Sequence, residues 1–125
     1  MNMKTMLCVP LALSGLMMSA PLLAEQGIDE ETAFRCLALH AVITESSEDI
    51  SGANSASLAV QWGEFIMGHF DVAATFEDKL DQAIGNLVKR VNDAEASSSE
   101  TMLALVRSEI ALCTEAEASS AFKGS

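Results

Sequence analysis

Aromatic residues are scarce in this chain. Tyrosine is absent and only 5% of the residues are aromatic, although half of all residues are apolar. A core must therefore be built mostly from Ala, Leu, Val, Ile and Met, which favours close packing of helices over a sheet sandwich. The 125 residues leave room for one domain, because a domain commonly takes roughly 100–200 residues.

Basic residues are also few, and their shortage excludes whole classes of partner. All 18 acidic residues follow Ala24, whereas Lys4, one of seven basic residues, precedes it. The chain after Ala24 thus has six basic and 18 acidic residues and a formal charge of −12. This charge repels phosphate backbones and anionic headgroups, so we expect no nucleic-acid binding and no membrane docking. Basic proteins, peptides or cations remain as partners, unless the charge serves only solubility.

Motifs for catalysis and ligand binding are missing as well. The chain has no Gly-x-Ser-x-Gly, no His-Glu-x-x-His, no phosphate-binding glycine loop and no calcium loop. It also lacks Cys-x-x-Cys and the Glu-x-x-His pairs of a metal site in a bundle core. We therefore predict no catalytic residue, no metal site and no cofactor. Glu45, Glu48 and Asp49 cluster in one polar stretch, which we interpret as a solvated loop rather than a cation site.

The first 24 residues are typical of a secretory signal peptide. Lys4 gives a positive start, an apolar run spans residues 6–24, and Ala24 is a small residue at the expected cleavage position. A retained membrane anchor is the alternative, since about 19 apolar residues nearly span a bilayer. Two prolines in the run and the lack of a basic flank favour cleavage. We therefore expect a protein that is exported to the periplasm or secreted.

Two cysteines, Cys36 and Cys113, remain after the signal peptide. In an exported protein such an even pair is expected to be oxidised. A disulfide closing a loop of about 77 residues stabilises a fold by roughly 4–5 kcal/mol. A reactive thiol or a metal ligand is the alternative, but no second ligand stands near either cysteine at metal spacing.

Four segments after the signal peptide show helical periodicity. The first runs from about residue 29 to residue 46, with Asp29 as N-cap, and ends in a polar loop. The second starts near residue 54. The third starts at about Thr75, so the chain is expected to reverse within residues 71–75.

The fourth predicted helix begins at a capping box, Ser97-x-x-Glu100. From about residue 117 the sequence becomes rich in serine, and we expect a loose tail there. Residues 25–125 are thus predicted to form a single helical domain.

The disulfide decides how these helices are arranged. Cys36 lies near the start of the first helix and Cys113 near the end of the last, so these two ends must meet. With a reversal after the second helix, the first and last helices run antiparallel and the cysteines come together. The sequence therefore predicts an all-α, four-helix up-and-down bundle, with a more irregular array of helical hairpins as the alternative. The same geometry places His40 opposite Glu109.

The second helix carries the clearest apolar stripe. Its glycines, Gly63 and Gly68, are expected where a neighbouring backbone comes close or the helix bends. His69 shares the stripe, and we interpret it as a core residue rather than as half of a His-x-Asp site with Asp71. Core packing is the simpler role for the ring-bearing residues of this region, and a pocket for a small apolar ligand is the alternative: Trp62, Phe65, His69, Phe70 and Phe76.

These observations predict a non-enzymatic module that binds another protein through its surface, as an inhibitor, immunity factor, adaptor or small chaperone. The basis is a small disulfide-closed bundle without a constellation of catalytic groups. A carrier of a small apolar ligand is the first alternative. A metal-dependent or hydrolytic enzyme that uses His40 and His69 is the second. Neither the partner nor the oligomeric state follows from the residues.

Overall fold

Helices are the regular secondary structure of the part that the structure describes. The computed structural model describes residues 27–46 and 54–124, in which no strand occurs. The predicted signal peptide and the acidic residues Glu48 and Asp49 lie outside these ranges. The helices are α3 (Glu30–Glu45), α4 (Ser55–His69), α5 (Phe76–Ser97), α6 (Ser99–Glu117) and the short α7 (Ser120–Lys123).

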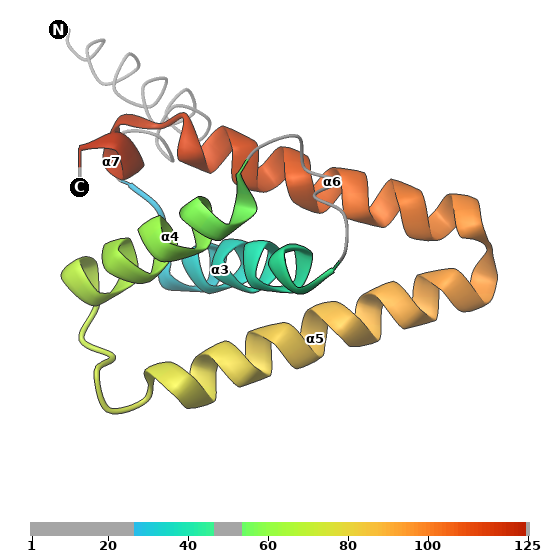
Figure 1. Ribbon diagram of the computed structural model, residues 1–125, viewed down its shortest axis with the longest axis horizontal. Coiled ribbons are helices and arrows are strands. Elements are labelled where there is room, and N and C mark those ends of the chain that lie inside the picture. Colours follow the sequence, from blue (N-terminus) through green and yellow to red (C-terminus); the bar gives the residue numbers. More distant parts are fainter. Residues whose placement is uncertain (1–26, 47–53, 125) are drawn as a thin grey trace, which may run out of the picture.

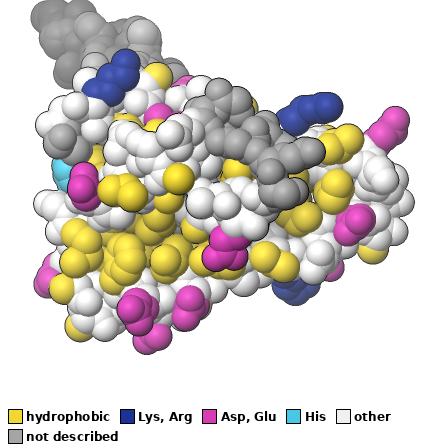
Figure 2. Space-filling model, in the orientation of Figure 1, with side chains coloured by type: hydrophobic (Ala, Val, Ile, Leu, Met, Phe, Trp, Pro, Cys, Tyr) yellow, Lys and Arg dark blue, Asp and Glu magenta, His cyan; other side chains and the backbone are white. Residues whose placement is uncertain are grey.

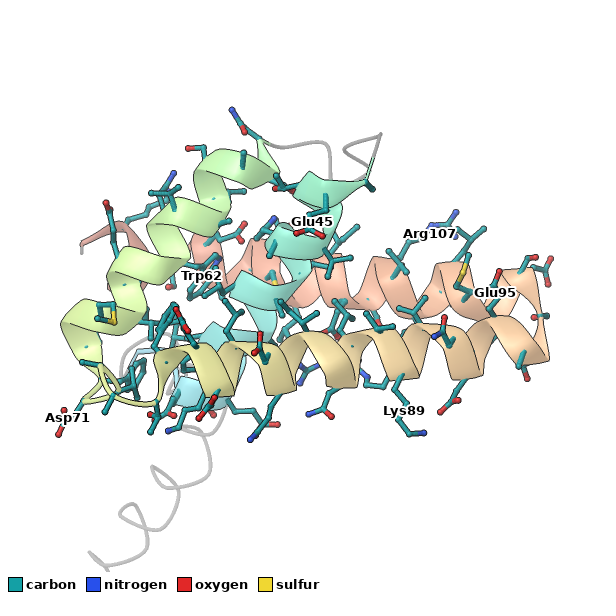
Figure 3. All side chains as sticks on the ribbon, turned by 60° about the horizontal axis from the view of Figure 1, so that its bottom comes forward. Glu45, Trp62, Asp71, Lys89, Glu95 and Arg107 are labelled. Carbon is teal, nitrogen blue, oxygen red and sulfur yellow. A yellow bond between two sulfur atoms is a disulfide. The ribbon has the colours of Figure 1, made fainter. Side chains whose placement is uncertain are left out.

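The four long helices run in alternating directions, which confirms the predicted up-and-down bundle (Figure 1). α3 packs against α4 on one side and α5 on the other, and α6 packs against α5. A turned view shows that the α3–α4 hairpin is inclined to the α5–α6 hairpin (Figure 3). The bundle is therefore two crossed hairpins, and α3 lies between the other helices.

Local capping explains where the helices begin. The Asp29 carboxylate accepts a hydrogen bond from the Thr32 amide, as predicted, and hydrogen bonding by Thr32 lowers the pKa of Asp29. α6 begins one residue later than expected, because Ser98 and not Ser97 accepts from the Thr101 amide. The reversal between α4 and α5 falls where the sequence predicts it.

The core is centred on α3. Eight of its 16 residues are buried, whereas α5 buries only Leu87 among its 22 residues. Trp62 and Ile66 on α4 are fully buried against it. A helix enclosed on several sides must be apolar around most of its circumference, which accounts for the Ala and Leu content of α3.

The disulfide between Cys36 and Cys113 is present and confirms the predicted pairing. Their Cα atoms lie 5.4 Å apart, and both side chains are buried in the core. The bond joins the first turns of α3 to the last turns of α6, so the two ends of the domain are covalently closed.

Removal of this bond should lower the free energy of unfolding. The double variant Cys36→Ser, Cys113→Ser loses a closed loop of 77 residues, and we expect a loss of roughly 4–5 kcal/mol on the chain-entropy account. Urea unfolding followed by circular dichroism measures it. A loss below about 1 kcal/mol would contradict a structural role for the bond.

The C-terminal tail differs from the expectation. It was predicted to be loose, but Ser119 caps the short helix α7 and Phe122 is 8% exposed. The Phe122 ring lies 4.3 Å from that of Trp62 and 5.8 Å from that of Phe65. The tail therefore folds back because its one aromatic residue covers the largest side chain of the core.

Phe122→Ala should uncover Trp62. We expect a loss of about 3 kcal/mol in the free energy of unfolding, typical of a buried Phe that is truncated, and a red shift of tryptophan fluorescence. Lys123→Ala, on the same turn but exposed, is the matched control and should change neither. An unchanged emission maximum in Phe122→Ala would show that α7 does not cover the indole.

Candidate functional site

The predicted aromatic cluster is a packed core rather than a ring of side chains around a ligand. Trp62 is 0% and Phe65 2% exposed, with ring centroids 5.5 Å apart. Phe70 lies at the edge of Phe65, whereas Phe76 contacts Phe34 on α3 instead. The rings thus pack against other aromatic rings of the protein, and this packing gives no support to the ligand-carrier hypothesis.

His69 is not a core residue. Its side chain is exposed, although its ring stacks on Phe65 with centroids 4.1 Å apart and its Nδ1–H donates to the Phe65 carbonyl at 2.9 Å. Phe65 lies one turn before His69 on α4, so both contacts of the ring stay within its own helix. His69 therefore packs against its own helix, and its hydrogen bond goes to Phe65 rather than to Asp71.

The second histidine, His40, lies in a buried polar chain. Its Nδ1 is 2.9 Å from Ser55 Oγ and its Nε2 is 2.6 Å from Glu117 Oε2, which also accepts from the Trp62 indole N–H at 2.8 Å. A hydroxyl, an imidazole and a carboxylate in this order resemble the groups of a serine hydrolase. Ser55 is only 1% exposed, however, so a substrate does not reach its oxygen in this structure.

The expected pairing of His40 with Glu109 is wrong. His40 binds Glu117, one turn beyond Cys113, whereas Glu109 lies one turn before it. The expectation assumed that α3 and α6 lie alongside each other. Because the two hairpins cross (Figure 3), α3 and α6 diverge on either side of the disulfide. Residues four positions from each cysteine are therefore not neighbours in the way that side-by-side helices would place them.

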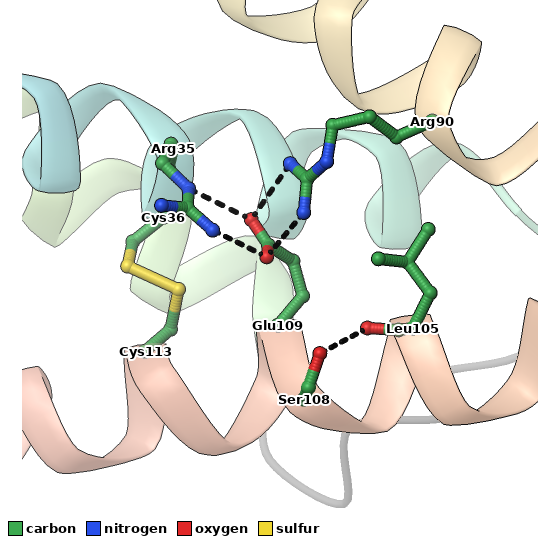
Figure 4. A network of polar contacts seen from close by, with 7 residues as sticks. All are labelled: Arg35, Cys36, Arg90, Leu105, Ser108, Glu109 and Cys113. Atoms are coloured by element: carbon green, nitrogen blue, oxygen red, sulfur yellow. Dashed lines mark hydrogen bonds and ion pairs between the residues drawn. A yellow bond between two sulfur atoms is a disulfide. The ribbon is translucent and has the colours of Figure 1, made fainter.

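Glu109 instead binds two arginines from two other helices (Figure 4). The Arg35 guanidinium donates from Nε at 3.1 Å and Nη2 at 2.7 Å, and Arg90 donates from Nη2 at 2.9 Å. Glu109 is 2% exposed. Burial alone would raise the pKa of Glu109, but hydrogen bonds and charges of Arg35 and Arg90 outweigh it and hold the pKa below its ordinary value.

These groups form the floor of a groove of about 920 Å³ between α3 and α5. Lys79 and Lys89 also line it, and each pairs with a carboxylate, Lys79 with Glu30 and Lys89 with Asp93. Four positive and four negative side chains line the groove: Arg35, Lys79, Lys89, Arg90, Glu30, Glu31, Asp93 and Glu109. The groove thus has no excess of either charge, and its polar contacts tie α3, α5 and α6 together.

Glu109→Gln should destabilise the bundle and change its response to acid. Removing one partner of a buried ion pair costs about 3–5 kcal/mol; the arginines here are more than a third exposed, so we expect about 2 kcal/mol. The lowered pKa of Glu109 stabilises the fold at neutral pH, and this stabilisation is lost in acid as the pH falls from the ordinary carboxyl range through the lower folded-state pKa.

Urea unfolding at several pH values checks both effects. The wild type should lose more unfolding free energy than Glu109→Gln between about pH 5 and pH 3. Asp93→Asn breaks an exposed pair and should cost less than about 1 kcal/mol. Equal acid sensitivity of the wild type and Glu109→Gln would contradict the assignment.

An apolar stripe runs along the solvent side of α4. Val60 is 61% and Met67 52% exposed, and their spacing of seven residues places them on one face of the helix. Gly63 lies between them. We call these three residues the α4 face. Among the described residues, no atom lies within 4 Å of a Cβ added at Gly63 or Gly68. The expected close backbone contact at these glycines is therefore wrong, and the alternative, a bend of the helix, stays a prediction.

The α4 face continues into a hollow at the turn between α4 and α5. Met67, Ala73, Ala74 and Phe76 line this hollow of about 450 Å³, together with the carboxylates Glu77 and Asp78. Figure 2 shows hydrophobic side chains gathered between α4 and α5, with acidic side chains along the lower edge. The surface is therefore apolar in its middle and negative at its border.

The sequence contains a signal for the α4 face, although we did not predict an apolar surface on this side of the helix. Val60 and Met67 lie on the side of α4 opposite the Trp62 stripe, where polar residues are the rule for a helix packed on one side. Two large apolar residues at a spacing of seven on that side indicate a second contact surface. The arginines that bind Glu109 carry no such signal, because their pairing depends on the crossing of the hairpins.

Within residues 27–46 and 54–124, no three His, Cys, Asp or Glu side chains are grouped to hold a metal ion. None of the described helices has the length and hydropathy needed to cross a bilayer. Comparison with protein-family models, with curated proteins and with solved structures finds no match.

Proposed function

We propose that this protein is an exported, non-enzymatic module that binds a basic, amphipathic segment of another protein through the α4 face. The observation that carries the proposal is the exposure of Val60 and Met67 beside the hollow at the α4–α5 turn. Exposed apolar side chains that gather in one place and have a polar border are typical of binding surfaces. Methionine suits such a surface because its flexible side chain adapts to a partner.

Gly63 supports the same face. A glycine in the middle of a helix costs about 1 kcal/mol relative to alanine, and no described residue comes close enough to Gly63 to require it. A missing side chain between Val60 and Met67 leaves room for a partner backbone to approach α4 closely. The proposed contact of a partner with α4 would thus account for a glycine that lowers the stability of the helix.

Charge indicates the chemistry of the partner. The chain carries a formal charge of −11, and Glu77 and Asp78 border the hollow. A positive partner is drawn toward such a surface over a distance set by the ionic strength, and an acidic one is repelled. An amphipathic segment with Lys or Arg on one side and apolar residues on the other matches both the border and the middle of the surface.

Export is the second part of the proposal. The Cys36–Cys113 bond is compatible with folding outside the reducing cytoplasm, where disulfides persist. The signal peptide expected at residues 1–24 would direct the chain there. The proposal is that the module acts in the periplasm or outside the cell.

A photo-crosslinking residue at position 67 tests for the partner. We expect it to capture a basic protein from the envelope or medium of cells that make this protein, whereas the same residue at Ala111, exposed on α6, should capture none. The crosslinked protein is then identified by mass spectrometry. Equal capture at the two positions, or capture only of acidic proteins, would contradict the proposal.

Gly63→Ala should separate fold from function. It should raise the free energy of unfolding by up to about 1 kcal/mol but weaken binding of the captured partner on the order of tenfold or more, because the new methyl group occupies the contact. Gly85→Ala, also in the middle of an exposed helical stretch with open space around it, should stabilise similarly and leave binding unchanged. Calorimetry measures both, and equal affinities of the two variants would contradict the α4 face.

A further inference from the structure

The far end of the α5–α6 hairpin has no partner among the described residues. Figure 1 shows that α5 and α6 extend together beyond α3 and α4. None of the residues 88–107, which we call the hairpin end, is buried. Several are large and apolar, and Val88 and Leu103 are 42% and 43% exposed. Two helices that pack mainly on each other thus carry more apolar surface than their mutual contact covers.

Val88 and Leu103 lie on the same side of the hairpin. Arg90 and Glu109 bind each other on the side of the α3–α5 groove. At about 100° per residue, Val88 is turned roughly 200° from Arg90, and Leu103 roughly 120° from Glu109. Both therefore point away from that groove, and Val91 and Val106 flank them half-buried. Figure 2 shows hydrophobic side chains over this part of α6 and toward α5.

The hairpin end differs in charge from the rest of the molecule. It contains three basic residues, Lys89, Arg90 and Arg107, and three acidic residues, Asp93, Glu95 and Glu100, and so has no net charge. The whole chain carries −11. Two copies of this chain would repel each other over most of their surface, and the repulsion is weakest where both present this neutral, apolar region.

We infer that the hairpin end is a homodimer interface. A second copy, related by a twofold axis, packs its own hairpin end across Val88 and Leu103 and forms a four-helix arrangement with the first. A twofold contact uses the same patch on both molecules, which a neutral apolar patch permits. The α4 face lies on a different helix, so the dimer does not depend on the proposed function.

Sedimentation of the disulfide-bonded protein over about 1–100 µM tests the inference. The wild type should shift from monomer to dimer within this range. Leu103→Glu and Leu103→Lys should both remain monomeric at the highest concentration, because either charge would have to be desolvated in the contact. The paired substitutions separate desolvation from a simple change of net charge, and circular dichroism confirms that each variant is folded.

Val60→Glu is the matched control, since Val60 is more exposed than Leu103 but lies on α4. It should dimerise as the wild type does. Higher salt should strengthen the dimer, because salt screens the repulsion between two acidic molecules. A wild type that stays monomeric, a dimer that dissociates equally in Val60→Glu, or a dimer that weakens with salt would each overturn the inference.

Discussion

The bond between Cys36 and Cys113 is the constraint on which the rest of the structure depends. It requires the first and the last long helix to meet, and with four helices in a short chain this is satisfied when successive helices alternate in direction. Glu109 lies one turn before Cys113 and pairs with Arg35 and Arg90. These ion pairs join α3, α5 and α6 in the same region as the disulfide. A covalent and an ionic tie thus act on one region of the bundle.

A small core follows from this arrangement. α3 is enclosed by its neighbours and supplies half of its residues to the interior, so little apolar surface of α5 and α6 is needed there. The fold is closed by one disulfide and one covering aromatic, Phe122, rather than by a large interior. Because the core is small, apolar side chains of α4, α5 and α6 face solvent, where other molecules can contact them.

The elements of the fold could be predicted because they depend on local pattern. Periodicity located the four long helices and the reversal after α4, and the count of cysteines indicated the disulfide. The neighbours of His40 and Glu109 could not be predicted, since they depend on how two hairpins cross, which is set by side-chain packing over the whole core. Phe122 was missed for a related reason: a lone aromatic in a serine-rich tail has no periodicity, and its position depends on a tertiary contact with the Trp62 ring.

The central claim is that the two cysteines are joined to each other in the native protein. Peptide mapping by mass spectrometry, on protein alkylated before any reduction, tests it most directly. The account predicts that the peptide containing Cys36 is found linked to the peptide containing Cys113, with neither thiol alkylated. Recovery of both cysteines as separate, alkylated peptides would contradict the account.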